Sequence, residues 1–306
     1  MLNRRAFIRK ASIGAGLALA GGFPLEALAA GPARKLTILH TNDTHSRLEP
    51  FPNDSGKYSG QGGVAARATL INRIRKEQEH VLLFDAGDIF QGTPYFNRWK
   101  GKPEINALSL MGYDAVTMGN HDFDAGVDGF ALQLQYAKFP VVVSNYDFTD
   151  TPLEGKTLPC TTIKKGGVKV GIFGLGIELS GLVSDNYFGN TKYLDPLPIA
   201  KRISEQLKKQ ENCELVVCLS HLGYEYDSSK ISDKILAAET EHIDLIIGGH
   251  THTFLDAPTT VRNKAGREVL INQAGWAGLR LGCITYSFES DKPARAVQGN
   301  SIDVKH

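Results

Sequence analysis

The sequence predicts an α/β protein with mixed β-sheets, and two patterns along the chain support this class. Short apolar runs without polar alternation recur from residue 35 onward, as is typical of strands covered on both faces. Stretches with helical periodicity separate these runs, and such alternation indicates strands joined by helices. Near the end of the chain, Ile284, Tyr286 and Phe288 alternate with Thr285 and Ser287, which favours a one-sided antiparallel strand.

The predicted elements follow one another along the chain. Buried strands are expected at the apolar runs 36–40, 81–84, 115–118, 141–143, 168–173, 215–219 and 243–247. Helices are expected over 63–78, ahead of Phe139-Pro140, behind Asp195-Pro196 and behind Ser228, because Asp-Pro and Ser are common helix starts. The segments 49–61 and 146–161 are predicted to be exposed loops.

The composition is that of an ordinary globular protein, and it argues against one class of partner. The 306 residues are 42% hydrophobic and 22% charged, with a formal net charge of +1. A protein that grips nucleic acid through a basic face carries a marked positive charge. Duplex nucleic acid is therefore not an expected partner.

Residues 1–29 have the pattern of an export signal. Basic residues between Arg4 and Lys10 precede a Gly- and Ala-rich apolar run, and Ala27-Leu28-Ala29 offers a cleavage pattern. The run is too weakly apolar for a membrane span, so no stable membrane anchor is expected after cleavage. Arg4-Arg5 resembles a twin-arginine signal, and an ordinary secretory signal is the alternative. We expect a periplasmic or otherwise exported protein.

Four cysteines remain beyond this segment: Cys160, Cys213, Cys218 and Cys283. In an exported protein they could form two disulfides, and the sequence does not fix the pairing. Cys218 and Cys283 lie inside apolar runs, where a thiol behaves as a small buried hydrophobe, so free thiols are favoured. The chain has no C-x-x-C spacing, which argues against a metal held by cysteine.

Polar side chains gather where the predicted strands end, which is where ligands bind in α/β sheets. Asp43 and His45 follow the first run and, two residues apart in an extended chain, point the same way. Asp88 follows the second run behind Gly87, which permits a sharp turn. Taken alone, an Asp in such a place is as well explained by a helix cap or a turn.

Three further strand ends carry histidine. Asn120, His121, Asp122 and Asp124 follow the run at 115–118; an amide can ligate a metal, and a His beside an acid can donate a proton. A single His221 follows the run at 215–219, where a buried hydrogen-bonded His is the simpler interpretation. The last cluster is a pair with the H-x-H spacing of a two-nitrogen metal site, His250 and His252.

The five clusters together, in the order D-x-H, G-D, G-N-H-D, H, G-H-x-H, resemble the calcineurin-like metallophosphoesterases. The segments 36–48, 62–71 and 85–93 look like the 5′-nucleotidase branch of that superfamily, and the resemblance extends from residue 36 to about residue 290. Asp122 stands where that branch usually has Glu, and it is not expected to contact metal.

The resemblance implies a fold and a site. The fold would be a four-layer α/β/β/α sandwich of two mixed sheets, formed by residues 30–306 as a single catalytic domain without the C-terminal nucleotide-selecting domain of the family. Two divalent ions (Zn, Mn, Fe or Co) would be held by one set of seven side chains: Asp43, His45, His252 at one ion, Asn120, His221, His250 at the other, and Asp88 bridging both. His121 and Asn120 would contact substrate, with His121 as proton donor oriented by Asp124.

The implied function is hydrolysis of phosphate monoesters, foremost 5′-nucleotides, by in-line attack of a hydroxide generated at the metals. Three alternatives stay open: a phosphodiesterase acting on cyclic or sugar nucleotides, a non-catalytic metal-binding subunit, and a hydrolase of sulfur esters. A separately encoded nucleotidase C-terminal domain is a candidate partner. The substrate, the metals and the oligomeric state are not fixed by the sequence.

Overall fold

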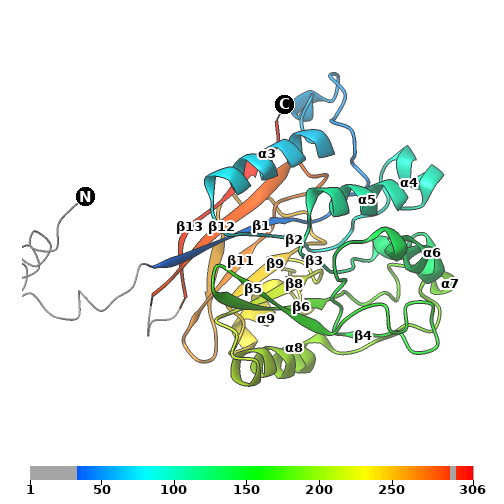
Figure 1. Ribbon diagram of the computed structural model, residues 1–306. Helices are drawn as coiled ribbons and strands as arrows, with labels where there is room; N and C mark the ends of the chain where they lie inside the picture. The colour runs from blue at the N-terminus through cyan, green and yellow to red at the C-terminus, as the bar shows by residue number, and fades with distance from the viewer. Residues whose placement is uncertain (1–32, 290–293, 306) are drawn as a thin grey trace, which may run out of the picture.

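The computed structural model describes residues 33–289 and 294–305, so the predicted export signal at residues 1–29 lies outside the described residues. Two large β-sheets form the centre of the molecule (Figure 1). A small third sheet pairs β4 (Tyr146–Asp147) with β7 (Lys192–Tyr193). In the described part of the chain, no helix is long and apolar enough to cross a bilayer.

The first large sheet has the strand order β13-β12-β1-β2-β3. Its strands are β1 (Arg34–Thr41), β2 (Val81–Asp85), β3 (Ala115–Val116), β12 (Arg280–Phe288) and β13 (Arg295–Asp303). The first three run parallel, because helices return the chain between them, whereas β12 is antiparallel to both β1 and β13. The carboxyl ends of β1, β2 and β3 therefore lie at the same edge.

The second large sheet has the order β10-β11-β9-β8-β6-β5. Four of its strands are parallel, namely β6 (Val168–Leu175), β8 (Leu215–Ser220), β9 (Leu245–Gly248) and β11 (Glu268–Asn272). Antiparallel strands β5 (Cys160–Lys165) and β10 (Thr259–Arg262) close its two edges. Both sheets are thus mixed, as predicted.

Three buried clusters show the layering. Leu39 and Leu83 of the first sheet pack against Ile71 and Leu108 of α3 (Val64–Glu77) and α5 (Lys102–Met111). A second cluster fills the space between the sheets, joining residues of β1 and β2 to residues of β6, β8 and β9. A third joins the second sheet to α8 (Pro196–Glu205) and α9 (Asp233–Glu239). The four-layer α/β/β/α prediction is confirmed, and Figure 1 shows α3 and α8 on opposite sides.

The remaining elements are short and lie around these layers. The helices are α4 (Pro94–Trp99), α6 (Gly126–Gln133) and α7 (Asp185–Phe188). Three short 3₁₀ helices are η1 (Gly56–Tyr58), η2 (His121–Phe123) and η3 (Leu134–Tyr136). A single π-helical turn, η4 (Gln206–Gln210), follows α8.

Helix starts were predicted with mixed success. Asp195 caps α8 as expected, since its carboxylate accepts the amide hydrogen of Leu197 at 3.0 Å. The prediction that Ser228 caps the next helix is wrong. Ser232 holds that position, with its side chain accepting from the amide of Ile235, and α9 begins at Asp233.

Three other local predictions need correction. Residues 141–143 form single bridges rather than a strand. Strand β12 is antiparallel as predicted but not one-sided, because Cys283 packs toward α3 and α5 while Ile284 packs between the sheets. The segment 146–161 is not simply exposed, since it buries three apolar side chains: Tyr146, Phe148 and Leu153.

The four cysteines carry free thiols, three of them buried.

Candidate metal centre

The polar side chains predicted from the sequence come together where strands of the two large sheets end. Asp43 and His45 follow β1, Asp88 follows β2, and Asn120 follows β3 in the first sheet. His221 follows β8, while His250 and His252 follow β9 of the second sheet. Two groups of ligand atoms converge to within 4.8 Å: Asp43, His45, His252 and Asp88, His221, His250.

Distances within the site link the two groups. Nε2 of His45 lies 3.0 Å from Nε2 of His252, which itself lies 3.4 Å from a carboxylate oxygen of Asp43. Asp88 Oδ2 lies 3.1 Å from Nε2 of His221 and 3.9 Å from Nε2 of His45. The Asp88 carboxylate therefore reaches side chains of both groups.

Asn120 reaches the same place from β3. Its amide oxygen Oδ1 lies 2.9 Å from Nδ1 of His250. The structure therefore brings together all seven side chains predicted as ligands.

Backbone hydrogen bonds fix the orientation of two of the histidines. The Nδ1–H of His221 donates to the carbonyl of Ala86 at 2.7 Å, and that of His45 donates to the carbonyl of Phe90 at 3.2 Å. Because Nδ1 carries the proton, Nε2 presents a lone pair toward the site, which is how metal-ligating imidazoles are usually held. Nε2 of His221 is buried and faces two carboxylates, 3.1 Å from an oxygen of Asp88 and 3.9 Å from one of Asp43.

The electrostatic environment suits cations. Two buried carboxylates, Asp43 and Asp88, face His221; burial opposes charge on this ring, yet the carboxylates raise its pKa to about 10. Burial lowers the pKa of His250 to about 4, so this ring is neutral near pH 7. The position where these carboxylates favour a proton on His221 is one where a metal ion would take the place of that proton. Imidazole nitrogens and carboxylates are the ligand set of Zn, Mn, Fe and Co. The Nε2 atoms of His221, His45 and His252 converge with the carboxylates of Asp43 and Asp88, and this set of donors fits divalent ions.

The backbone around the site adopts conformations that side chains rarely take. Five of the seven predicted ligands have positive φ angles: Asp43 (49°), His45 (47°), Asp88 (56°), His250 (73°) and His252 (51°). Each costs on the order of 1 kcal/mol or more and persists only where the surroundings enforce it, which is common at functional sites.

Two glycines let the strand ends approach each other. A Cβ on Gly87 would collide with the backbone of Gly119. One on Gly119 would collide with the carboxylate of Asp88 and the ring of His221. Both positions exclude any larger residue without movement of the ligands.

Asp122 has a role that the sequence analysis missed. Its buried carboxylate accepts four backbone amide hydrogens, from Gly119 (2.8 Å), Asp88 (3.0 Å), Ile89 (2.9 Å) and Phe90 (3.1 Å). Through these hydrogen bonds to the backbone, Asp122 shapes the turn that carries Asp88. No signal in the sequence separates this Asp from a turn residue, because three of its four partners lie 32 to 34 residues away.

Asn42 is a second missed residue. Its side-chain amide donates both to the carboxylate of Asp43 and to the carbonyl of Gly275, each at 2.6 Å. Its oxygen accepts the amide hydrogen of Ala274 at 2.8 Å. Asn42 therefore ties the turn between β11 and β12 to the end of β1.

His121 and Asp124 form the predicted pair beside the ligands. Nδ1 of His121 donates to a carboxylate oxygen of Asp124 at 2.8 Å, and this hydrogen bond raises the pKa of His121. The His121 side chain is 38% exposed, and its ring lies edge-on to that of His45 at 5.3 Å. A partly exposed, protonatable imidazole therefore faces the solvent side of the site.

Residues 36–254 match the model of one protein family, Calcineurin-like phosphoesterase. The chain belongs to the calcineurin-like phosphoesterase family. This membership puts it in the class of metal-dependent phosphoester hydrolases, as predicted from the sequence.

Relatives of this phosphoesterase include 5′-nucleotidases. It is 34% identical over 294 residues to a snake venom 5′-nucleotidase of Gloydius brevicauda, covering 88% of this chain and 48% of the venom protein. A 5′-nucleotidase precursor of Thermus thermophilus has a similar structure, with 34% identity, a TM-score of 0.80, and coverage of 88% of this chain and 54% of that one. The chain spans about half the length of the curated relatives it matches.

A third likeness has a matching length. The calcineurin-like phosphoesterase YfkN of Bacillus subtilis is 25% identical with a TM-score of 0.71, covering 90% of this chain and 91% of that one.

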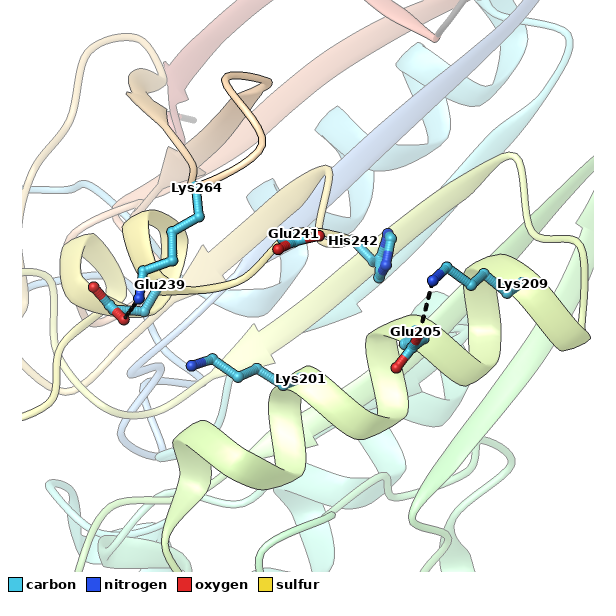
Figure 2. Close-up of a pocket in the computed structure, with 7 residues that line it drawn as sticks. All are labelled: Lys201, Glu205, Lys209, Glu239, Glu241, His242 and Lys264. Carbon is cyan, nitrogen blue, oxygen red and sulfur yellow. Dashed lines mark hydrogen bonds and ion pairs between the residues drawn. The ribbon is translucent and has the colours of Figure 1, made fainter.

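The phosphoesterase also has a surface pocket of about 300 Å³ beside α8 and α9 (Figure 2). Four of the residues that line it form two ion pairs, Lys209 with Glu205 at 2.7 Å and Lys264 with Glu239 at 2.5 Å. Exposed ion pairs of this kind contribute at most about 1 kcal/mol to stability, and neither group of candidate metal ligands lines this pocket. The chemistry is therefore expected at the strand ends.

Proposed function

We propose that this chain is the catalytic domain of an exported, dinuclear-metal phosphoesterase that hydrolyses phosphate monoesters, with 5′-nucleotides as the foremost substrates. The observation that carries the proposal is the pair of ligand groups that share Asp88, with His121 and Asp124 beside them. The 5′-nucleotidases among the relatives support the substrate class.

Seven side chains would hold the two ions. Asp43, His45 and His252 would hold one, Asn120, His221 and His250 would hold the other, and Asp88 would contribute to both. When bound, two divalent ions supply positive charge that polarises a phosphoryl group and lowers the pKa of water.

The other residues of the site act on the substrate. A protonated His121 would donate a hydrogen bond to the leaving oxygen and deliver its proton there as the ester bond breaks. Asp124 would accept the hydrogen of Nδ1 and so stabilise the protonated ring, which leaves the proton on Nε2 free for the leaving oxygen. Asn120 would present its amide toward the phosphoryl oxygens, and Asp122 and Asn42 would keep Asp88 and Asp43 in place.

A substrate panel tests the proposal. Purified protein loaded with Mn²⁺ or Zn²⁺ is given AMP, p-nitrophenyl phosphate, UDP-glucose and 2′,3′-cyclic AMP. Inorganic phosphate is measured for the two monoesters, and chromatography measures UMP formed from UDP-glucose and 2′- or 3′-AMP formed from the cyclic nucleotide. We expect turnover of the two monoesters, with AMP preferred. Turnover of the two diesters alone would make the chain a phosphodiesterase, and no turnover with both ions bound would make it a non-catalytic subunit.

A separately encoded nucleotidase C-terminal domain remains part of the proposal as a candidate partner. The relatives support it because they are about twice as long as the matched region. If such a partner selects the nucleotide, its addition lowers KM for AMP and leaves KM for p-nitrophenyl phosphate unchanged. Equal effects on both substrates would argue against it.

Export through a twin-arginine signal is proposed from Arg4-Arg5 and the cleavage pattern that follows them. Replacing both arginines with lysine should retain the precursor in the cytoplasm, as seen by immunoblot of cell fractions. Unchanged export of that variant would support an ordinary secretory signal instead.

A further inference from the structure

The imidazole of His252 contacts two other rings, those of Trp276 and His45. Its imidazole lies parallel to the indole of Trp276, with an interplanar angle of 7° and ring centroids 5.9 Å apart. The ring also meets that of His45 at 68°, with centroids 5.0 Å apart. Trp276 comes from the turn between β11 and β12, a segment that no predicted motif includes.

His252 lacks the support that the other histidines have. His45 and His221 each donate Nδ1–H to a backbone carbonyl, and His250 Nδ1 faces Asn120. Within residues 33–289 and 294–305, the polar contacts of His252 are made through Nε2 alone. Its side chain is also 40% exposed, against 10% for His45 and 0% for His221. Neither hydrogen bonding nor burial therefore fixes the plane of this ring.

Trp276 is itself held firmly. Phe51 and Tyr58 meet its ring edge-to-face at 5.8 Å and 6.3 Å, at angles of 78° and 83°. The amide of the next residue, Ala277, donates to the carbonyl of Asp43 at 2.7 Å. These contacts hold the indole beside Asp43, at the end of β1. The position of the indole face therefore restricts the orientation of the His252 ring that stacks on it.

We propose that Trp276 is a positioning residue for the metal centre: its indole face fixes the plane of His252 and presets this ligand for the ion shared with Asp43 and His45. The inference rests on the ligand assignment in the proposed function. Stacking takes the place of the second hydrogen bond that a metal-ligating imidazole normally makes, because both remove the rotational freedom of the ring before the ion binds.

The proposal predicts an effect on one ion and not on the other. Loss of a group that orients a ligand typically weakens metal affinity 10- to 100-fold, and we expect about that range for Trp276→Ala. The ion at Asn120, His221 and His250 has its own oriented histidines. Its affinity should change by less than about threefold, well below that range.

Metal affinity provides the test. Full-length protein is stripped with a chelator and titrated with Co²⁺ against a chromophoric competitor, and visible absorption follows the environment of each bound Co²⁺. Trp276→Ala should weaken one Co²⁺ site and alter its spectrum, whereas Trp276→Phe, which keeps a flat ring, should restore most of the affinity. The matched control is Trp99→Ala, because Trp99 is 44% exposed and stacks on Tyr95 away from the ligands.

Each outcome decides the matter. The inference is overturned if the wild type binds two Co²⁺ ions and Trp276→Ala leaves both affinities unchanged or lowers both equally. Either result leaves the proposed function standing. A wild-type protein that binds no Co²⁺ overturns both. If Trp276→Ala does not fold, Tyr58→Leu serves instead, since loosening the indole should weaken the same site by a smaller factor.

Tryptophan emission gives a second readout. In a Trp99→Phe protein the remaining emission comes from Trp276, which contacts a ligand of the site. Co²⁺ should quench this emission as the site that contains His252 fills. In a Trp276→Phe protein the emission of Trp99 should stay nearly constant, and equal quenching in both proteins would contradict the proposal.

Discussion

Replacing Asp122 with Asn tests whether this carboxylate builds the turn that carries Asp88. The substitution keeps the size of the side chain and replaces one oxygen with an NH₂ group. Each oxygen of Asp122 now accepts two backbone amides: Oδ2 those of Asp88 and Gly119, and Oδ1 those of Ile89 and Phe90. An asparagine can satisfy only one of these pairs.

The cost follows from the two amides that lose their acceptor. A buried donor left unsatisfied costs about 1–3 kcal/mol, so the free energy of unfolding should fall by roughly 2–6 kcal/mol. The displaced amides include that of Asp88 or those just after it, so metal affinity should fall as well. Urea unfolding followed by circular dichroism, in EDTA so that metal release does not contribute, measures the first effect.

The matched control is Asp128→Asn, which removes the same charge from an exposed position on α6. It should shift the unfolding free energy by less than about 0.5 kcal/mol. If Asp122→Asn and Asp128→Asn unfold alike, and both bind metal like the wild type, the assigned role of Asp122 is refuted.

The remaining predictions concern catalysis, metal and acid. His121→Ala should lower kcat about 10²- to 10⁴-fold with metal content near normal by elemental analysis; loss of metal together with activity would instead make His121 a ligand. Chelation should abolish phosphate release and lower the melting temperature, with Mn²⁺ or Zn²⁺ restoring both, and an unaffected melting temperature would contradict binding between the two sheets. Burial lowers the pKa of His40 to about 3, so on acidification from about pH 6.5 the unfolded chain gains a proton that the folded chain does not, and stability falls. His40→Asn should reduce that loss by up to about 1.4 kcal/mol per pH unit in urea unfolding with EDTA, and an unchanged slope would refute it.

The ligands could be predicted from sequence because each follows an apolar run. A run such as Leu215–Ser220 predicts a buried strand. The first polar side chain after the run then lies at the carboxyl end of that strand, where ligands bind in α/β sheets. A different rule, the preference for Asp-Pro and Ser at helix starts, predicted the cap of α8 at Asp195. It failed at α9, because Ser228 and Ser232 are equally good caps in sequence and only packing chooses between them.

The supporting residues could not be predicted in this way. Asp122, Asn42 and Trp276 act mainly through partners that are distant in sequence, and these contacts exist only once the chain has folded. Strand β13 escaped prediction for a different reason: it lies at the sheet edge with several residues exposed, so its sequence lacks a buried apolar run.

The pairing of β1 with β12 has a consequence for the order in which the protein is made. Thr37 and Thr285 share a hydrogen bond across 248 positions of sequence, so the strand that carries Asp43 waits for almost the whole chain before its antiparallel neighbour exists. At ribosomal speeds of about 5–20 residues per second, that wait lasts roughly 12–50 s. The turn that holds Trp276 arrives only just before β12. Asp43, His45 and Asp88 are therefore synthesised early, while the first sheet is still incomplete. The arrangement that would hold two ions forms only when translation is nearly complete.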